Sequence, residues 1–402
     1  MTDTEKRGAR PLVFIFLTVF LDLLGVGILV PVIPFIVAEF RSDALTVGLL
    51  SLTFAAAQFL ASPVLGALSD RYGRRAVLLL SVLGTGGGYF LFGFAQTLWL
   101  LFLARLIDGF TGGNISTAQA YIADVSLPED RAKNFGLIGA AFGLGFILGP
   151  AIGGVLSHVS LRAPAFAAAG LSLVTVGLGY LMLPESLPRE RRVRTPFRLR
   201  ELHPLGHLGE ALRRPGVRRL FVAFFAISFA MAGLQSNYAV FTREQFGLGP
   251  AGTAWLFTLV GAISVLVQGV LLRRIPTGGR ERAIAMAGLA IMAAGFAATA
   301  FAPSVRWLYL ATGLLALGNA AAAPMLTSEV SRNVGGEEQG RILGSMQSVA
   351  SLTRILGPLW AGLAFDHIGF GAPYWTGAVW VLAGLAAAAL SFRPADRAAH
   401  AT

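Results

Sequence analysis

Four ionisable residues lie inside long apolar runs of this sequence, and they are the residues best placed to do chemistry: Asp22, Arg105, Asp108 and Arg354. A charge in hydrocarbon costs at least about 2.5–3.5 kcal/mol on insertion scales, so each is a candidate for function. Desolvation disfavours a charged carboxylate and a nearby arginine favours it, so a buried acid beside an arginine can take up and release a proton. We expect these four residues to handle protons.

Asp22 is the principal candidate and Asp108 the second. A helix rises 1.5 Å per residue, so Asp22 and Asp108, each ten residues from an end of its run, lie about 15 Å deep, near the midplane. Arg105 and Asp108, three residues apart, could instead form a static pair within one helix. No cation lies within four residues of Asp22 in its run. One helical face is expected to gather a polar stripe of Arg105, Asp108, Gly112, Ser116 and Gln119.

Other polar residues within apolar runs could line a substrate cavity. Each alone is more commonly a helix–helix hydrogen bond than a ligand contact. The candidates for substrate binding are Gln58, Asn114, Gln119, Gln235, Asn237, Tyr238, Asn319 and Gln347.

The elements that must position these residues are membrane-spanning helices. Of 402 residues, 55% are hydrophobic and 13% are charged, whereas soluble domains carry roughly a quarter charged residues. A spanning helix needs about 20 apolar residues, and the run after the basic start is too long for a signal peptide, so we interpret it as a retained first helix. Twelve runs qualify, at 12–38, 45–68, 77–95, 98–122, 134–156, 163–183, 218–241, 252–272, 283–301, 306–329, 340–363 and 372–392.

The basic residues predict the orientation. With the N-terminus cytoplasmic, 26 of the 32 Lys and Arg residues fall in cytoplasmic segments and four in outer loops. Positive charge is retained on the cytoplasmic side, so both termini are expected inside. The lack of long outer loops and of an evident eukaryotic sorting signal favours a bacterial inner membrane. The net charge of +11 is spread over short loops, which indicates membrane topology and no nucleic-acid partner.

The sequence repeats internally. Arg131 to Gly154 can be laid on Gln339 to Gly362 with a constant shift of 208. Two related six-helix halves with a site between them are typical of secondary transporters. We predict an all-α integral membrane protein of two pseudo-symmetric six-helix bundles, residues 1–183 and 218–402, joined by an Arg-rich cytoplasmic linker at 184–217.

Several other classes find little support. The chain has no cysteine, which excludes disulfides and thiolate metal sites. His203 and His207 are four residues apart, but they lie in the Arg-rich linker without a nearby glutamate pair, so we expect no metal site. A phosphate-binding loop of the Walker type is missing, and we expect neither an enzyme nor a cofactor.

Two glycine-containing motifs stand out. The loop after the second run contains Gly66, Asp70, Arg71, Gly73, Arg74 and Arg75. Gly73 permits a tight turn, and Asp70 can face the positive N-terminus of a neighbouring helix. The fifth run contains Gly145, Gly149, Pro150, Gly153 and Gly154; glycines one turn apart allow close helix contact, and the proline invites a bend.

These motifs make the chain resemble the major facilitator superfamily along essentially its whole length. The first run, Leu21 to Pro34, is similar to that of the drug/proton antiporters, and above all the tetracycline exporters. The resemblance implies that the Gly66–Arg75 loop, joined by Asp124, latches the halves in the outward-facing state. It also implies that the glycines of the fifth run mark an antiporter and that Arg105 takes part in proton coupling.

The sequence departs from the tetracycline exporters where substrate should bind. Gly88, before Tyr89, stands where they carry an acid, and Ser264 and Met292 stand where they carry a His and an Asp. The resemblance therefore argues against a tetracycline–metal chelate as the substrate. It favours export of a small amphipathic compound by proton antiport, by a protein that we expect to be monomeric.

Two alternatives stay open. One is a uniporter or importer of a nutrient such as a sugar, whose site would use amide and aromatic groups. The other, from a different class, is a membrane receptor that transports nothing. The motif in the fifth run and the buried acid count against the first, and failure to move any solute in vesicles would favour the second.

Overall fold

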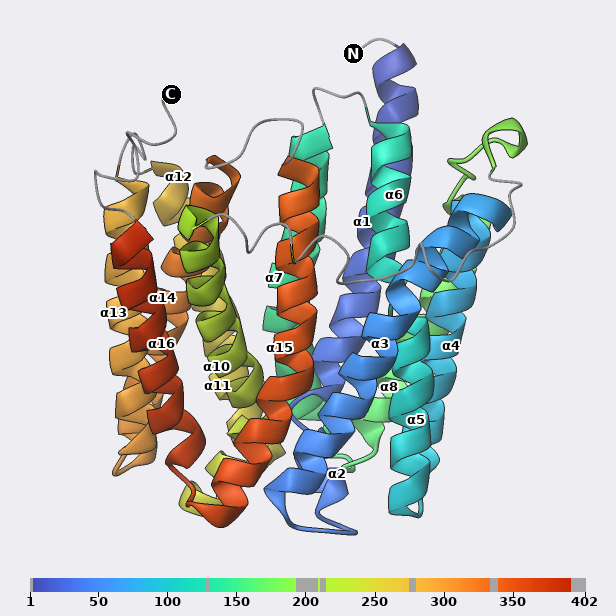
Figure 1. Cartoon of the computed structure of the whole chain (residues 1–402). Helices are drawn as coiled ribbons and strands as arrows, with labels where there is room; N and C mark the ends of the chain where they lie inside the picture. Colours follow the sequence, from blue (N-terminus) through green and yellow to red (C-terminus); the bar gives the residue numbers. More distant parts are fainter. Residues whose placement is uncertain are drawn as a thin grey trace, which may run out of the picture. The chain divides into compact units, whose positions relative to one another are not determined.

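A computed structural model of the chain describes residues 3–126, 131–192, 209, 215–274, 280–332 and 339–391, and these residues form helices joined by short turns (Figure 1). The predicted all-helical fold is confirmed. Most of the linker predicted at 184–217, with His203 and His207, lies outside the described residues.

The chain divides into two compact units, and neither coincides with one half of the sequence. Unit 1 comprises residues 1–42, 53–203 and 250–258, and unit 2 comprises residues 43–52, 204–249 and 259–402. The helix α3 (Ala44–Tyr72) therefore begins in unit 2 and continues in unit 1, whereas α11 (Pro250–Val265) begins in unit 1 and continues in unit 2.

Unit 1 is built from α1 packed against α7 and α8, with α4 packed against α5 and α8. Thr97 caps the start of α5 by accepting a hydrogen bond from the backbone N–H of Leu100. Pro164 lies in the first turn of α8, where a missing N–H costs nothing. The helices are α1 (Asp3–Leu29), α2 (Ile33–Val37), α4 (Arg74–Phe94), α5 (Leu98–Thr111), α6 (Asn114–Val125), α7 (Arg131–Leu156) and α8 (Ala163–Met182), followed by the 3₁₀ turn η1 (Arg189–Arg191).

Unit 2 is built from α10 packed against α15 and α16, with α13 packed against α14 and α16. Its helices are α10 (Pro215–Phe246), α12 (Leu272–Arg274), α13 (Glu281–Ala300), α14 (Val305–Arg332), α15 (Gln339–His367) and α16 (Ala372–Ser391). A π-helical segment, η3 (Leu266–Leu271), interrupts the run from α11 to α12.

Two predicted spans are divided. The run 98–122 consists of α5 and α6, which meet at Gly112 and Gly113 (Figure 1). The run 12–38 consists of α1 and α2, with a turn around Pro31. Proline removes a backbone donor, and glycine costs about 0.5–1 kcal/mol in a helix interior, so both favour a break.

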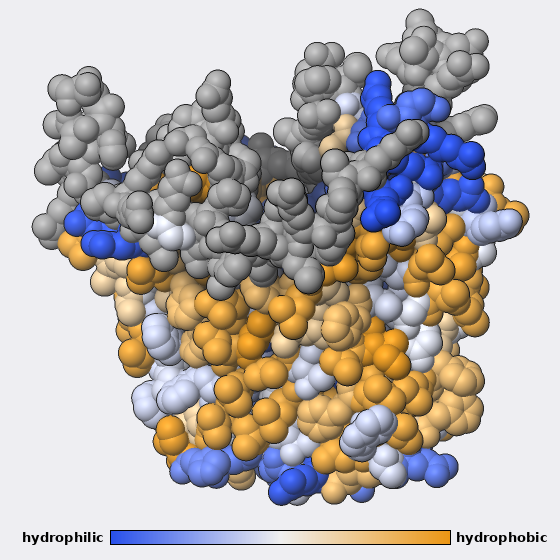
Figure 2. All heavy atoms as spheres, turned by 45° about the vertical axis from the view of Figure 1, so that its right-hand side comes forward, coloured by the Kyte–Doolittle hydropathy of each residue, from blue (hydrophilic) through white to orange (hydrophobic). Residues whose placement is uncertain are grey.

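Eleven helices among the described residues are long and apolar enough to cross a membrane. The twelfth predicted span is the divided pair α5 and α6, each shorter than a bilayer requires. Figure 2 shows apolar side chains over the middle of one face and hydrophilic residues towards its edges. Exposed large apolar residues such as Leu80, Leu181 and Leu310 suit contact with lipid.

Candidate functional site

One buried acidic site in unit 1 is formed by Asp22 on α1. Its side chain is buried, with 8% of the residue exposed. The Oδ2 atom accepts a hydrogen bond of 3.0 Å from Nδ2 of Asn114, at the start of α6. The other oxygen, Oδ1, has no hydrogen-bond partner among the described residues. Asp22 thus has one anchored oxygen and one that is free to accept a proton.

A second acidic site lies on α5, where Arg105 and Asp108 form an ion pair. Nη1 of Arg105 is 2.6 Å from Oδ2 of Asp108, and only 2% of Asp108 is exposed. The guanidinium carbon of Arg105 lies 4.3 Å from the ring centre of Phe54 on α3, a cation–π contact. The pair that we considered as an alternative is therefore formed, and the ring of Phe54 further fixes the arginine.

Helix α4 joins the two acidic sites. A side chain at Gly88 would place its Cβ 3.0 Å from Cβ of Asp108 and 3.1 Å from the carbonyl oxygen of Ala104, so α4 and α5 are in backbone contact there. The next residue, Tyr89, has its ring edge 3.3 Å from where a Cβ of Gly25 would lie on α1. Tyr89 was not among the predicted site residues, although a tyrosine within an apolar run carries a hydroxyl that needs a partner.

The break between α5 and α6 positions the polar groups around these acids. Gly109 packs against α3 so closely that a Cβ would lie 2.5 Å from the carbonyl oxygen of Phe54. Gln58 on α3 donates from Nε2 to the exposed carbonyl oxygen of Gly112, at 2.8 Å. The break also interrupts the predicted polar stripe, since Asp108 is buried whereas Gln119 is exposed. The predicted stripe is therefore divided between α5 and α6, although Gly112 and Ser116 both make hydrogen bonds with α3.

Arg74 organises a charged cluster at the junction of α3 and α4. Its Nη2 lies 2.6 Å from Oδ1 of Asp70, and its Nε lies 3.1 Å from Oδ2 of Asp124 on α6. Its Nη1 donates to the Ser69 hydroxyl at 2.6 Å. Gly73 has a φ of +106°, which favours glycine. The structure thus brings together Asp70, Gly73, Arg74 and Asp124, four of the predicted latch residues.

The remaining latch residues lie around this cluster. Arg75 donates to the carbonyl oxygen of Tyr180, and its guanidinium carbon lies 5.4 Å from the ring centre of that tyrosine. Arg71 is exposed. Gly66 faces α6, where a Cβ would lie 3.9 Å from the hydroxyl of Ser116.

Glu185, which follows α8, was not among the predicted site residues. Its Oε1 accepts a hydrogen bond of 2.9 Å from the backbone N–H of Arg74 and so caps the N-terminus of α4. Its Oε2 lies 3.5 Å from Nη2 of Arg192. Asp70, which we expected to face a helix N-terminus, instead pairs with the side chain of Arg74. An acid immediately after an apolar run and before several arginines was the available signal.

The glycines of α7 bring it into backbone contact with α1. A Cβ on Gly149 would lie 2.6 Å from Cα of Gly27, and one on Gly153 would lie 2.2 Å from the carbonyl oxygen of Ile28. Gly145 faces Leu23 at 3.1 Å, next to Asp22 in the chain. Gly154 faces Ala254 on α11 instead, and Pro150 lies within the helix. This contact fixes the helix that carries Asp22.

The residues predicted in unit 2 have different surroundings. Asn237 donates to the carbonyl oxygen of Ala361 at 3.3 Å, and the Tyr238 hydroxyl pairs with that of Thr312. Arg354 donates to Ser351 at 3.3 Å, and the described residues include no acid paired with it. Gln235 and Gln347 are exposed, whereas Asn319 is half-buried.

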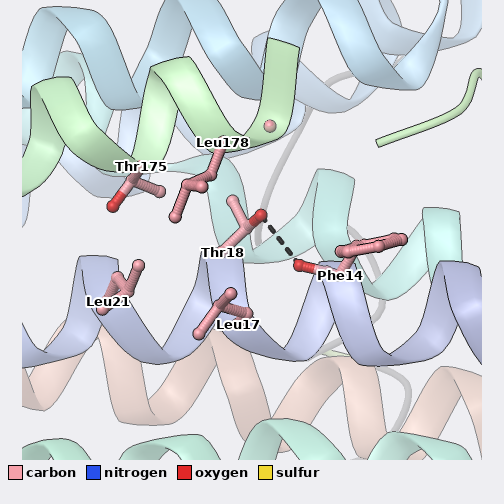
Figure 3. A pocket seen from close by; sticks show the side chains of 7 residues that line it. Phe14, Leu17, Thr18, Leu21, Thr175 and Leu178 are labelled. Atoms are coloured by element: carbon pink, nitrogen blue, oxygen red, sulfur yellow. Dashed lines mark hydrogen bonds between the residues drawn. The ribbon is translucent and has the colours of Figure 1, made fainter. Parts of the chain in front are cut away.

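A small pocket lies between α1 and α8, as Figure 3 shows. Its polar groups, Thr18 and Thr175, donate their hydroxyls to the carbonyl oxygens of Phe14 and Leu171, at 2.9 and 2.8 Å. Leucines supply most of the remaining wall. Because both hydroxyls already donate within their own helices, neither has a hydrogen left to donate to a ligand.

Within the described ranges, no three His, Cys, Asp or Glu side chains gather as metal ligands would. Ser264 donates to the carbonyl oxygen of Val260 at 2.8 Å, and Met292 is fully buried. What the geometry offers is a pair of buried carboxylates, one with a free oxygen and one paired with arginine.

The sequence is similar to known bacterial resistance proteins. The sequence is 35% identical over 388 residues to the class C tetracycline resistance protein of Escherichia coli, covering 94% of both chains. It is 28% identical to multidrug resistance protein 2 of Bacillus subtilis, covering 88% of this chain and 89% of that protein.

Solved structures share the fold. The human organic anion transporter MFSD10 aligns with a TM-score of 0.72 at 27% identity, covering 95% of this chain and 99% of that one. The nucleoside transporter NupG aligns with a TM-score of 0.76 at 15% identity, over 95% of this chain and all of the other, which bears on fold alone. The sequence profile of the Major Facilitator Superfamily matches residues 15–280 and 277–402. This chain therefore belongs to the major facilitator superfamily and is a multi-pass membrane transporter, not an enzyme.

Proposed function

We propose that this protein exports small amphipathic compounds by proton antiport and that Asp22 is the site where the coupling proton binds. The observation that carries the proposal is the carboxylate of Asp22, buried in a membrane-spanning helix with one oxygen unpartnered. A buried carboxylate without a neutralising cation is far more stable when it carries a proton. Protonation and the binding of a cationic or polar substrate group can then compete for the same charge.

Arg105 and Asp108 have a different role in this proposal. Their ion pair at 2.6 Å favours the charged form of Asp108 in the described conformation. If the pair opens during transport, Asp108 loses its cation and becomes the second proton site. Arg105 thereby biases which carboxylate holds the proton. In unit 2, the candidate for a role in proton coupling is Arg354, which has no acidic partner among the described residues.

The charged cluster around Arg74 supports alternating access. It joins α3, α4 and α6 through two carboxylates. Forming or breaking these ion pairs would therefore change how the three helices pack against one another. In this proposal the cluster forms in the outward-facing state and loosens in the inward-facing one. It lies on the cytoplasmic side, with both termini, in a bacterial inner membrane, and the protein acts as a monomer.

The relatives' names support the direction of transport, since they are called tetracycline and multidrug resistance proteins. We propose that the substrate is an amphipathic compound without a bound metal. Ser264 and Met292, which replace a His and an Asp of the tetracycline exporters, are no metal ligands here, because one is bonded to its own helix and the other is buried in packing.

The proposal is tested in vesicles containing the purified protein and a pH dye, with a pH gradient imposed. Ethidium, tetraphenylphosphonium, tetracycline with and without Mg²⁺, and glucose are added in turn. We expect an amphipathic compound to move protons with the wild type and not with Asp22→Asn. Asp108→Asn, the matched variant of the other acid, should retain part of the activity.

Other outcomes would redirect the proposal. Solute movement without proton movement, unchanged in Asp22→Asn, would show a facilitator, and glucose as the transported compound would show a nutrient carrier. Movement of no compound, by a protein that still binds one of them, would favour a receptor.

A further inference from the structure

We propose that Tyr89 passes the proton between Asp108 and Asp22. The inference rests on the proposed function, because it assigns the route between the two acids of a proton-coupled transporter. Tyr89 would be the third residue of the coupling site, and α4 the element that joins the acid of α5 to the acid of α1.

The position of Tyr89 is fixed by backbone packing on both sides of it. Gly88 presses α4 onto α5 at Asp108, with its would-be Cβ 3.0 Å from the Cβ of that residue. The ring of Tyr89 lies on α1 at Gly25, and its Cε2 atom, next to the carbon that bears the hydroxyl, makes the contact. Gly25 is three residues after Asp22, so both lie on the same side of α1.

Charged groups of both acidic sites act on the hydroxyl of Tyr89. The negative charges of Asp108 and Asp22 and the positive charge of Arg105 all act on the phenol of Tyr89. The charge of Asp22 also acts on Asp108. Both acids are therefore within electrostatic reach of one tyrosine.

Three buried polar atoms of this cluster have no partner among the described residues: Oδ1 of Asp22, the hydroxyl of Tyr89 and Nε of Arg105. Only 1% of Tyr89 is exposed. Buried hydroxyls are nearly always hydrogen-bonded, so an unpartnered one needs an explanation, and the two acids that act on Tyr89 supply one here. The three atoms are complementary, since the carboxylate accepts, the guanidinium donates and the phenol does both.

The proton transfer is balanced and needs no charged tyrosine. Protonated Asp108 gives its proton to the Tyr89 oxygen while the phenol gives its own proton to Oδ1 of Asp22. Asp108 ends as a carboxylate, Asp22 as a carboxylic acid, and the phenol is unchanged. A water molecule can extend either step, because proton transfer through one water remains efficient. Asn114 holds Oδ2 of Asp22 and leaves Oδ1 as the acceptor.

The test compares Tyr89→Phe with the wild type in vesicles, using the compound that gives the largest proton movement. Phenylalanine keeps the ring that packs on Gly25 and removes only the hydroxyl. We expect proton-coupled transport to fall at least tenfold. Exchange of labelled for unlabelled compound at equal pH, which needs no net proton transfer, should stay within twofold of the wild type.

Tyr374→Phe is the matched control. Tyr374 is also fully buried, and its hydroxyl also has no partner among the described residues, but it lies in unit 2 and no carboxylate acts on it. Removal of the Tyr374 hydroxyl should leave the rates of proton-coupled transport and of exchange at equal pH near those of the wild type.

Two failures can be told apart. If the wild type moves no protons with any compound, the proposed function is wrong. If the wild type is coupled and Tyr89→Phe moves protons within twofold as fast, or if both of its rates fall equally, the relay through Tyr89 is wrong and the coupling proposal stands.

Discussion

The close contact between α1 and α7 predicts that one added methyl group lowers the stability of the protein. In Gly149→Ala the new Cβ would lie 2.6 Å from Cα of Gly27, whereas unstrained carbon atoms approach to about 3.5–4.0 Å. The neighbouring atoms are backbone, which cannot rotate away, so the helices must separate locally by about 1 Å. Overpacking of this kind typically costs about 1–3 kcal/mol.

The same helix supplies the control. Gly139, also on α7, has nothing within 4 Å of where its Cβ would lie. Alanine is favoured over glycine in a helix interior by roughly 1 kcal/mol, so Gly139→Ala should be neutral or slightly stabilising. The two variants make the same chemical change in one helix and differ only in the space available.

Thermal unfolding in detergent measures the difference, by tryptophan fluorescence and by loss of monodisperse protein after heating. Since the chain has no cysteine, thiol-reactive dyes cannot report unfolding. We expect a lower midpoint for Gly149→Ala than for Gly139→Ala, with proton-coupled transport reduced in the first variant alone. Equal midpoints for the two variants would refute the close packing of α1 and α7.

Three further predictions follow from the charged groups. In Arg74→Ala, Asp70 and Asp124 lose their cation, so we expect the free energy of unfolding to fall by roughly 2 kcal/mol and the unfolding midpoint to drop. Arg71→Ala, at an exposed position, is the control. An equal loss of stability in Arg71→Ala would contradict the importance of the cluster. Arg105→Ala should let Asp108 become protonated at neutral pH, which would appear as a new carboxylic-acid band in the infrared spectrum. The band should be missing when Arg105→Ala is combined with Asp108→Asn. A band that remains in this double variant would belong to another acid. In Asp366→Ala, the N–H groups of Ala44 and Leu45 lose the carboxylate that accepts from them at 3.0 and 2.7 Å, so hydrogen exchange at the start of α3 should speed up several-fold, and unchanged exchange would show that this cap contributes nothing.

The membrane helices could be predicted from sequence because lipid imposes a simple rule on composition. A spanning helix must be apolar over its whole length, and that property is local. The break at Gly112 and Gly113 was not predicted, because the apolar run continues through it. Its cause is packing and hydrogen bonding against α3, which hydropathy does not report.

The candidate site could be predicted only in part. Asp22 and Asp108 stand out because a charge within an apolar run is conspicuous. Asn114 was predicted as a substrate-binding residue, but its hydrogen bond to Asp22, 92 positions away, was not predicted. Tyr89 is an ordinary residue for a membrane helix, and its importance arises from its contact with Gly25, which also lies far away along the chain. Asp366 and Glu185 cap helices that start 322 and 111 residues away from them along the chain, and no local pattern encodes such contacts.

Proton release on substrate binding tests the central claim most directly. The purified protein is placed in weakly buffered detergent solution with a pH dye, and the compound that moved protons in vesicles is added. The account predicts that the wild type releases protons as it binds the compound and that Asp22→Asn binds it and releases none. Equal proton release from the two proteins would contradict the assignment of the coupling proton to Asp22.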